Sequence, residues 1–236
     1  MLGRARLELL PSGALAGAAQ LAIELGDWRG IYAGAVNGIA VGDAEPLQVR
    51  ACDELVIDAP EAGGIVDDGA ALQRAIESAK RPLRLTIDRL DTLAAVIGLV
   101  GAERVMLGPK LRRLKRSWSY LERTVRAADA AVWIDAQPTR DVTESDALAV
   151  YGGRRAPGRG VALGMRPDVD AMATFVEDTG ATRVWIRVGS SGLQEGGAAA
   201  LASLLRSRSR SRPRVVEVVT AQTQLSLFAH PPRGGL

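Results

Sequence analysis

Short apolar runs alternate along the chain with longer segments in which apolar residues recur every three or four positions. The short runs are rich in Val, Ile and Leu and predict β-strands. They occupy residues 6–10, 29–34, 53–59, 83–88, 103–108, 130–136, 160–165, 182–189 and 214–221. The longer segments have the period of a helix with one buried face and predict helices over residues 13–25, 66–80, 90–100, 109–128, 168–179 and 193–207.

This alternation of strands and helices predicts an α/β fold. Strands that are apolar on both faces are typical of a mostly parallel, doubly wound sheet with helices on both faces. The spacing of the strands would also suit a TIM-like barrel, which stays open as an alternative. We expect a single α/β domain over residues 1–220, with a subdomain break near the glycine- and arginine-rich segment 151–160, and a flexible tail over 221–236.

Composition places the chain among globular proteins without a membrane anchor. Of its 236 residues, 47% are hydrophobic, which is enough for a large core. No apolar run approaches the roughly 20 residues that cross a bilayer, and the start "MLGRARLELLPSG" lacks the features of a signal peptide. We therefore expect a cytoplasmic protein.

The chain has one cysteine, Cys52, and one histidine, His230. A single thiol cannot form an internal disulfide or a thiolate metal cluster. Because the histidine lies in the tail, the body has no side chain for Ser-His-Asp or Cys-His catalysis, and none for a His-ligated zinc or iron site.

Positive charge is concentrated in two short segments of an otherwise acidic chain. Residues 101–126 hold 8 basic and 2 acidic residues, and residues 201–236 hold 6 basic residues and 1 acidic residue. Such segregation points to a polyanion as partner. It favours nucleic acid over a membrane, because no amphipathic anchor accompanies the charge.

Each basic segment offers cations that could lie along DNA phosphates. In the helix predicted over 109–128, one face carries an apolar stripe formed by Leu111, Leu114, Trp118, Leu121 and Val125. The opposite face is cationic and carries Arg112, Lys115, Arg116, Arg123 and Arg126. The second segment, "RSRSRSRPR", predicts a phosphate clamp formed by Arg206, Arg208, Arg210 and Arg212. The alternative in both segments is structural: a solubilising helix face, or cations beside helix carbonyls.

Three aspartates each close an apolar strand: Asp58, Asp88 and Asp135. The carboxyl ends of parallel strands share one edge of a sheet, so these carboxylates could converge there and hold Mg²⁺. Two such ions would suit phosphodiester hydrolysis. Asp after a strand is also a common turn former, and we expect no metal or cofactor outside this nuclease alternative. Whether the protein is an enzyme stays open.

The segment "RLELLPSGALAGAAQLAIELGD" has the layout of a strand, a glycine turn and a helix, and in this it resembles the opening of a RecA-like ATPase. The Gly-Lys-Ser/Thr ending of a phosphate loop is missing, since Ala14, Leu15 and Ala16 follow Gly13. No lysine can therefore reach the β- and γ-phosphates, and ATP hydrolysis by that route is not expected.

The stretch "AQTQLSLFA" places large apolar residues after the last predicted strand. Five of its residues resemble, at every position, the linear motif with which bacterial polymerases and repair proteins bind the β sliding clamp: Gln224, Leu225, Ser226, Leu227 and Phe228. The resemblance implies that Gln224 enters a small polar subsite of the clamp, and that Leu227 and Phe228 enter an apolar pocket. Alternatively, residues 222–228 continue the last strand and bury the leucines in the protein's own sheet.

These features together predict a bacterial DNA replication or repair accessory protein, held at the β sliding clamp by its tail and contacting DNA through its basic segments. The degenerate nucleotide-binding opening beside a clamp motif is distantly similar to the RecA-like accessory proteins of translesion (SOS) mutagenesis, the ImuA type. That likeness implies a translesion polymerase as a further partner. The competing hypotheses are a magnesium-dependent nuclease or phosphodiesterase, and a TIM-like metabolic enzyme with an accidental tail match.

Overall fold

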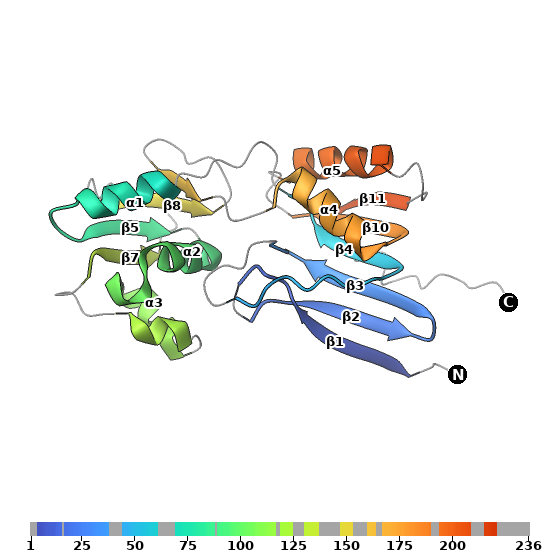
Figure 1. The fold of residues 1–236 in the computed structure, drawn as a ribbon, viewed down its shortest axis with the longest axis horizontal. Helices are drawn as coiled ribbons and strands as arrows, with labels where there is room; N and C mark the ends of the chain where they lie inside the picture. Colours follow the sequence, from blue (N-terminus) through green and yellow to red (C-terminus); the bar gives the residue numbers. More distant parts are fainter. Residues whose placement is uncertain are drawn as a thin grey trace.

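The structure is a computed structural model, and its architecture is α/β, as the sequence predicts (Figure 1). It describes residues 4–15, 17–37, 44–60, 69–87, 89–116, 119–124, 130–136, 147–152, 160–163, 167–189, 194–208 and 215–220. The described strands are β1 (Ala5–Pro11), β2 (Ala19–Leu25), β3 (Trp28–Gly34), β4 (Glu54–Asp58), β5 (Leu83–Ile87), β6 (Val105–Leu107), β7 (Val132–Ala136), β8 (Ala147–Gly152), β9 (Val161–Leu163), β10 (Arg183–Val188) and β11 (Val215–Thr220). The α-helices are α1 (Gly69–Ser78), α2 (Leu90–Val100), α3 (Pro109–Arg112), α4 (Val169–Thr179) and α5 (Glu195–Arg208), with 3₁₀ turns η1 (Ala102–Arg104), η2 (Arg113–Arg116) and η3 (Ser119–Arg123).

The described strands form two sheets. Sheet A has six strands in the order β1-β2-β3-β4-β10-β11. Its first part is an antiparallel meander of β1, β2 and β3. From β3 onward the pairing is parallel, through β4 and β10 to β11. Sheet B has five strands in the order β6-β7-β5-β8-β9 and is parallel throughout. These strands therefore do not build the single closed barrel of the TIM-like alternative.

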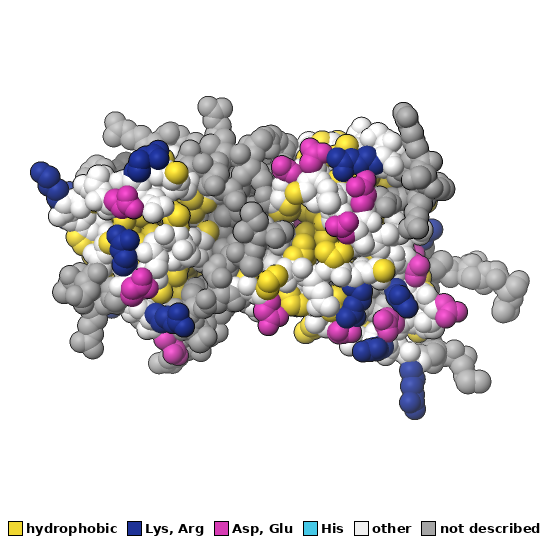
Figure 2. Space-filling model, viewed as in Figure 1, with side chains coloured by type: hydrophobic (Ala, Val, Ile, Leu, Met, Phe, Trp, Pro, Cys, Tyr) yellow, Lys and Arg dark blue, Asp and Glu magenta, His cyan; other side chains and the backbone are white. Residues whose placement is uncertain are grey.

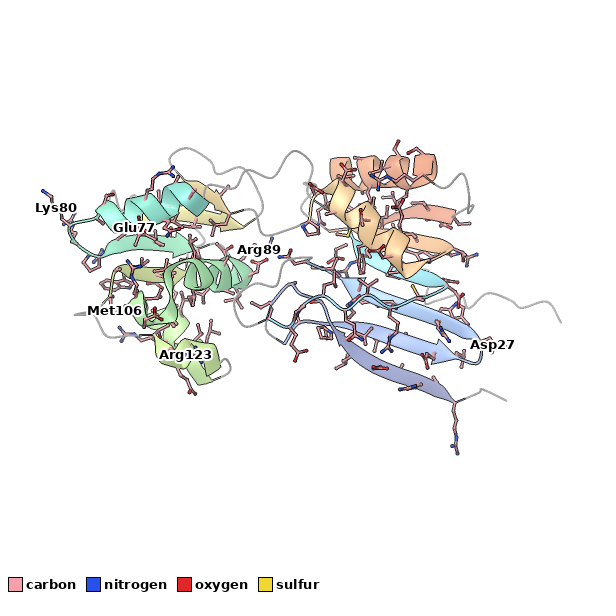
Figure 3. All side chains as sticks on the ribbon, in the orientation of Figure 1. Asp27, Glu77, Lys80, Arg89, Met106 and Arg123 are labelled. Atoms are coloured by element: carbon pink, nitrogen blue, oxygen red, sulfur yellow. The ribbon has the colours of Figure 1, made fainter. Side chains whose placement is uncertain are left out.

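The parallel strands of both sheets end toward the middle of the molecule (Figures 1 and 3). Asp27, in the turn before β3, lies at the outer end of sheet A. Lys80, which precedes β5, lies at the outer end of sheet B, whereas Arg89, which follows β5, lies near the middle. The carboxyl ends of the parallel strands thus face one another. Ligands of open α/β sheets commonly bind in a crevice outside such strand ends.

Sheet A buries one face beneath α4 and α5. Along β4 and β10 every second residue is fully buried, including Leu55 and Ile186, because successive side chains of a strand point to opposite faces. Helix α4 begins at Asp168, whose carboxylate accepts a hydrogen bond of 2.7 Å from the backbone N–H of Ala171. It ends at Gly180, which has the left-handed φ of 66° common at helix ends.

Sheet B is covered by α1 and α2. Its core joins Leu72 of α1 and Leu93 of α2 to Leu85 and Ile134 of the central strands, and each of these side chains is at most 1% exposed. Helix α2, "LDTLAAVIGLV", is apolar on most of its surface, which is typical of a helix that packs on more than one side.

The other face of sheet A carries exposed apolar side chains. The register places Leu7 and Leu9 of β1 on one face with Ile23, Leu21 and, on β3, Tyr32. Leu7 is 64% exposed and Leu9 is 71% exposed. Apolar surface that is shared by neighbouring strands is a common feature of interaction sites.

The helix predicted over residues 13–25 is wrong, because this segment forms the turn and second strand of a β-hairpin. Strand β2 pairs with β1 in antiparallel register from Ala5↔Leu25 to Pro11↔Ala19. Gly13 and Gly17 have φ values of 70° and 81°, which do not occur in a right-handed helix. The strand, turn and helix layout on which the ATPase resemblance depends is therefore not present.

The continuous helix predicted over residues 109–128 is also wrong. Helix α3 covers four residues and is followed by η2 and η3. The apolar stripe is kept in part, since Leu111 and Leu121 are 4% and 0% exposed. The sequence "SWSY" between the basic residues has a lower helix propensity than its neighbours, which favours a break.

Strand β8 was not predicted; it pairs with β5 in parallel.

Cys52 lies in the core of sheet A, and burial raises the pKa of its thiol to about 11, although a hydrogen bond with Thr179 acts in the opposite direction. We expect little reaction of the native protein with a thiol reagent at pH 8, and rapid reaction in urea, because the thiolate is the nucleophile.

Since the folded pKa lies above the ordinary value of 9.0, the thiol favours the folded state below pH 9, and this contribution is lost between pH 9 and 11. Urea unfolding of wild type and Cys52→Ala at pH 8 and pH 10.5 measures this loss as a change in the free energy of unfolding. If the difference in that free energy between the two proteins does not change with pH, the prediction is wrong.

Candidate functional site

The strand-end aspartates do not lie on one sheet edge. Asp58 ends β4 in sheet A, and Asp135 lies in β7 of sheet B. Asp88 lies outside the described residues. Among the residues that the structure describes, no group of three His, Cys, Asp or Glu side chains is arranged to hold a metal ion.

Asp58 forms an ion pair with Arg187 of the neighbouring strand β10. The Nε and Nη2 atoms of Arg187 lie 2.6 and 2.5 Å from Asp58 Oδ1. The guanidinium also lies 5.3 Å from the ring centroid of Tyr32 on β3, within the range of a cation–π contact. The hydrogen bond to Asp58 raises the pKa of Arg187. The Asp58 carboxylate is thus already neutralised by a cation, which does not favour a role for Asp58 as a magnesium ligand.

Asp135 has a local structural contact. Its Oδ1 accepts a hydrogen bond of 2.9 Å from the backbone N–H of Ala136. The carboxyl group also lies directly against Gly108, where a β-carbon would overlap it. Asp135 thus has local contacts within β7 and beside the start of α3, and these contacts are not those of a turn.

A cavity of about 370 Å³ lies between elements of the two sheets. One side comes from the loops that follow β1 and β3, and the other from the start of α2; the lining is Ala14, Leu15, Ala35, Val36, Asn37, Arg89, Leu90 and Asp91. Arg89 and Asp91 form an ion pair with each other, and Asp91 also accepts a hydrogen bond from the backbone N–H of Thr92. Leu15 packs against the core of sheet B. The cavity is therefore mainly apolar, and its charged side chains are paired.

Three of the predicted DNA-binding cations contact the protein itself. Arg112 Nε donates to the carbonyl of Leu107 at 2.9 Å, and Arg206 Nη2 donates to the carbonyl of Val216 at 2.8 Å. Arg208 pairs with Asp170 at 2.7 Å and with Glu177 at 3.5 Å, both on α4. These contacts join α3 to β6 and α5 to β11 and α4, so the three cations have structural contacts of a kind that the sequence analysis did not predict.

The other predicted cations are described only in part. Arg123, in η3, is exposed (Figure 3). Lys115 and Arg116 lie in η2, but their side chains, and all of Arg126, Arg210 and Arg212, lie outside the described part of the chain. On the face shown in Figure 2, described basic side chains are interspersed with acidic ones and do not form one cationic stripe.

The predicted clamp motif, residues 224–228, lies outside the described residues. The last described strand, β11, is an edge strand of sheet A and ends at Thr220. In the sequence the motif begins four residues later.

A groove of about 920 Å³ on sheet B joins residues that the sequence reasoning missed. It is lined by Ala79, Lys80, Arg81, Pro82, Leu83, Arg84, Met106 and Trp133. The guanidinium of Arg84 lies 4.8 Å from the ring centroid of Trp133. The available signal was the alternation within "LRLTID" and "AVWIDA", which places Arg84 and Trp133 on the opposite face from the buried Leu85 and Ile134.

Comparisons with protein-family models and with curated proteins gave no match to this chain. Among the described residues, no helix is both long and apolar enough to span a membrane.

Proposed function

We propose that this protein is a bacterial DNA replication or repair accessory protein that binds the β sliding clamp through residues 224–228 and also contacts DNA. The complete five-residue clamp motif, placed just after the last described strand, carries this proposal. In the clamp-binding family such a motif binds as an extended peptide. No described helix or strand contains the motif, so none of them has to unfold to present it.

The physical basis of the proposal is the addition of two weak contacts. Leu227 and Phe228 are large apolar anchors, the type of side chain that supplies most of the free energy of binding at an interface. A clamp encircles DNA, so a body that also touches DNA raises the effective concentration of the tail at the clamp. The role supported in this way is recruitment rather than catalysis.

The proposal is tested with a fluorescent peptide of residues 221–236 and a purified bacterial β clamp. We expect the wild-type peptide to bind with a Kd in the micromolar range. The peptide with Leu227→Ala and Phe228→Ala should lose at least about 100-fold in affinity, because each of the two anchors is worth about 2 kcal/mol or more. Thr223→Ala is the matched control, since it shortens a side chain directly beside the motif. The same variants in the full-length protein should have unchanged circular dichroism. Equal affinity of the wild-type and double-alanine peptides would reject the clamp interaction.

A further inference from the structure

The groove on sheet B is built by three neighbouring strands. In the parallel register Met106 of β6 lies beside Trp133 of β7, and Trp133 lies beside Arg84 of β5. These residues form one row across the sheet, on the face opposite the core beneath α1 and α2. Lys80 and Arg81, between α1 and β5, also line the groove, and Figure 3 shows Lys80 at the outer end of sheet B. A volume of about 920 Å³ lies near the upper end of the range of small-molecule sites, about 300–1,000 Å³.

The charge of the groove is complementary to a polyanion. Among the described residues that line it are the three cations Lys80, Arg81 and Arg84 and no carboxylate. Lys80 and Arg84 are exposed, so their charged ends can reach a ligand in solvent. This distribution differs from the rest of residues 1–100, in which acidic residues outnumber basic ones.

The aromatic component selects for unpaired bases. Trp133 is partly buried beneath the guanidinium of Arg84, and both groups are planar. An unpaired base can stack on a tryptophan ring or on a guanidinium plane, whereas the bases of a duplex are already stacked on each other. Phosphate contacts alone would accept either form, so the pairing of cations with an aromatic surface favours a single strand.

We propose that this groove binds single-stranded nucleic acid, with a base stacked on the Arg84–Trp133 pair and phosphates held by Lys80 and Arg81. The cations of this site are none of those that the sequence analysis predicted to contact DNA. This site goes beyond the proposed function, because it does not depend on the clamp motif.

The first test is fluorescence anisotropy of a labelled 15-residue oligo-dT with the full-length protein at low salt. Trp133→Leu should weaken binding by about tenfold, since stacking on one aromatic side chain is worth roughly 1–3 kcal/mol per base. Trp133→Phe keeps an aromatic face and should stay within about threefold of wild type. Arg74→Gln, an exposed cation on α1 that does not line the groove, is the charge control and should bind almost as wild type does.

The second test uses an exposed residue, so that it does not depend on how Trp133 variants fold. Lys80→Gln should reduce the slope of log K against log salt by about 0.7, the contribution of one phosphate contact to a single strand. Duplex DNA of the same length should bind more weakly than the oligo-dT. A Trp133→Leu protein that is folded and binds normally, an unchanged salt slope, or equal affinity for duplex would each overturn the proposal.

The two proposals can fail separately. Variants of the groove should leave clamp binding unchanged, and the Leu227→Ala, Phe228→Ala protein should bind oligo-dT as the wild type does. A protein that binds oligo-dT but not the clamp would therefore contradict the clamp proposal and leave the groove proposal intact.

Discussion

Replacement of Gly13 by alanine is expected to lower the free energy of unfolding by about 3 kcal/mol. Gly13 has a φ of 70°, a region in which an L-residue with a β-carbon is strained by about 1–2 kcal/mol. A β-carbon at this position would also overlap the carbonyl oxygen of Asn37. That carbonyl cannot withdraw easily, because Asn37 is 6% exposed and its N–H donates to the carbonyl of Ser12 at 3.0 Å. Overpacking against fixed backbone adds about 1–3 kcal/mol.

Gly17→Ala is the matched control for Gly13→Ala. Gly17 has a similar φ of 81°, but a β-carbon there would have no neighbour within 4 Å. The control therefore carries the conformational strain without the overlap, and we expect a loss of about 1 kcal/mol. Urea unfolding of the two variants, followed by circular dichroism, gives the difference. Equal losses would mean that the loop after β1 moves away from Asn37, and that the two loops lining the small cavity are not held together.

Two of the described strands, β2 and β8, were missed, and each contains only one of the β-branched residues that favour a strand. The segments "ELVID" and "RVWIRV" became β4 and β10, because Val and Ile favour strands. By contrast, β2 is "AQLAIEL", whose Ala, Leu, Gln and Glu are good helix formers. Its state is decided by pairing with β1 and by the left-handed Gly17, and neither can be read from helix propensity. Strand β8, "ALAVYG", was missed because its start lacks β-branched residues.

The prediction of the site residues was limited by the unknown order of the strands more than by the chemistry of the side chains. The sequence identified Asp58 and Asp135 as strand-end carboxylates, but only the strand order assigns them to different sheets. The contact between Arg84 and Trp133 depends in the same way on the pairing of β5 with β7, two strands with β6 between them in the chain. The basic segments were found from composition, whereas the internal bonds of Arg206 and Arg208 depend on how α5 packs against β11 and α4.

The ion pair of Asp58 and Arg187 is expected to stabilise the fold. Arg187→Met should lower the free energy of unfolding by about 2 kcal/mol, because it leaves a carboxylate that is only 21% exposed without its partner cation. The double variant Arg187→Met, Asp58→Asn should be more stable than Arg187→Met alone, since the neutral amide has less need of a cation. A double-mutant cycle from urea unfolding measures this coupling.

The same variants separate the structural role of Asp58 from the nuclease alternative. If Asp58 held magnesium, Asp58→Asn would abolish metal-dependent cleavage of DNA, and Arg187→Met would strengthen magnesium binding by removing a competing cation. If the pair is structural, neither variant changes cleavage, and the cycle gives a coupling free energy of about 1 kcal/mol or more. A coupling near zero together with loss of cleavage in Asp58→Asn would reverse the assignment. The geometry supports the structural role, because both contacts of the Arg187 guanidinium are with Oδ1 of Asp58 and compensate the negative charge of its carboxylate.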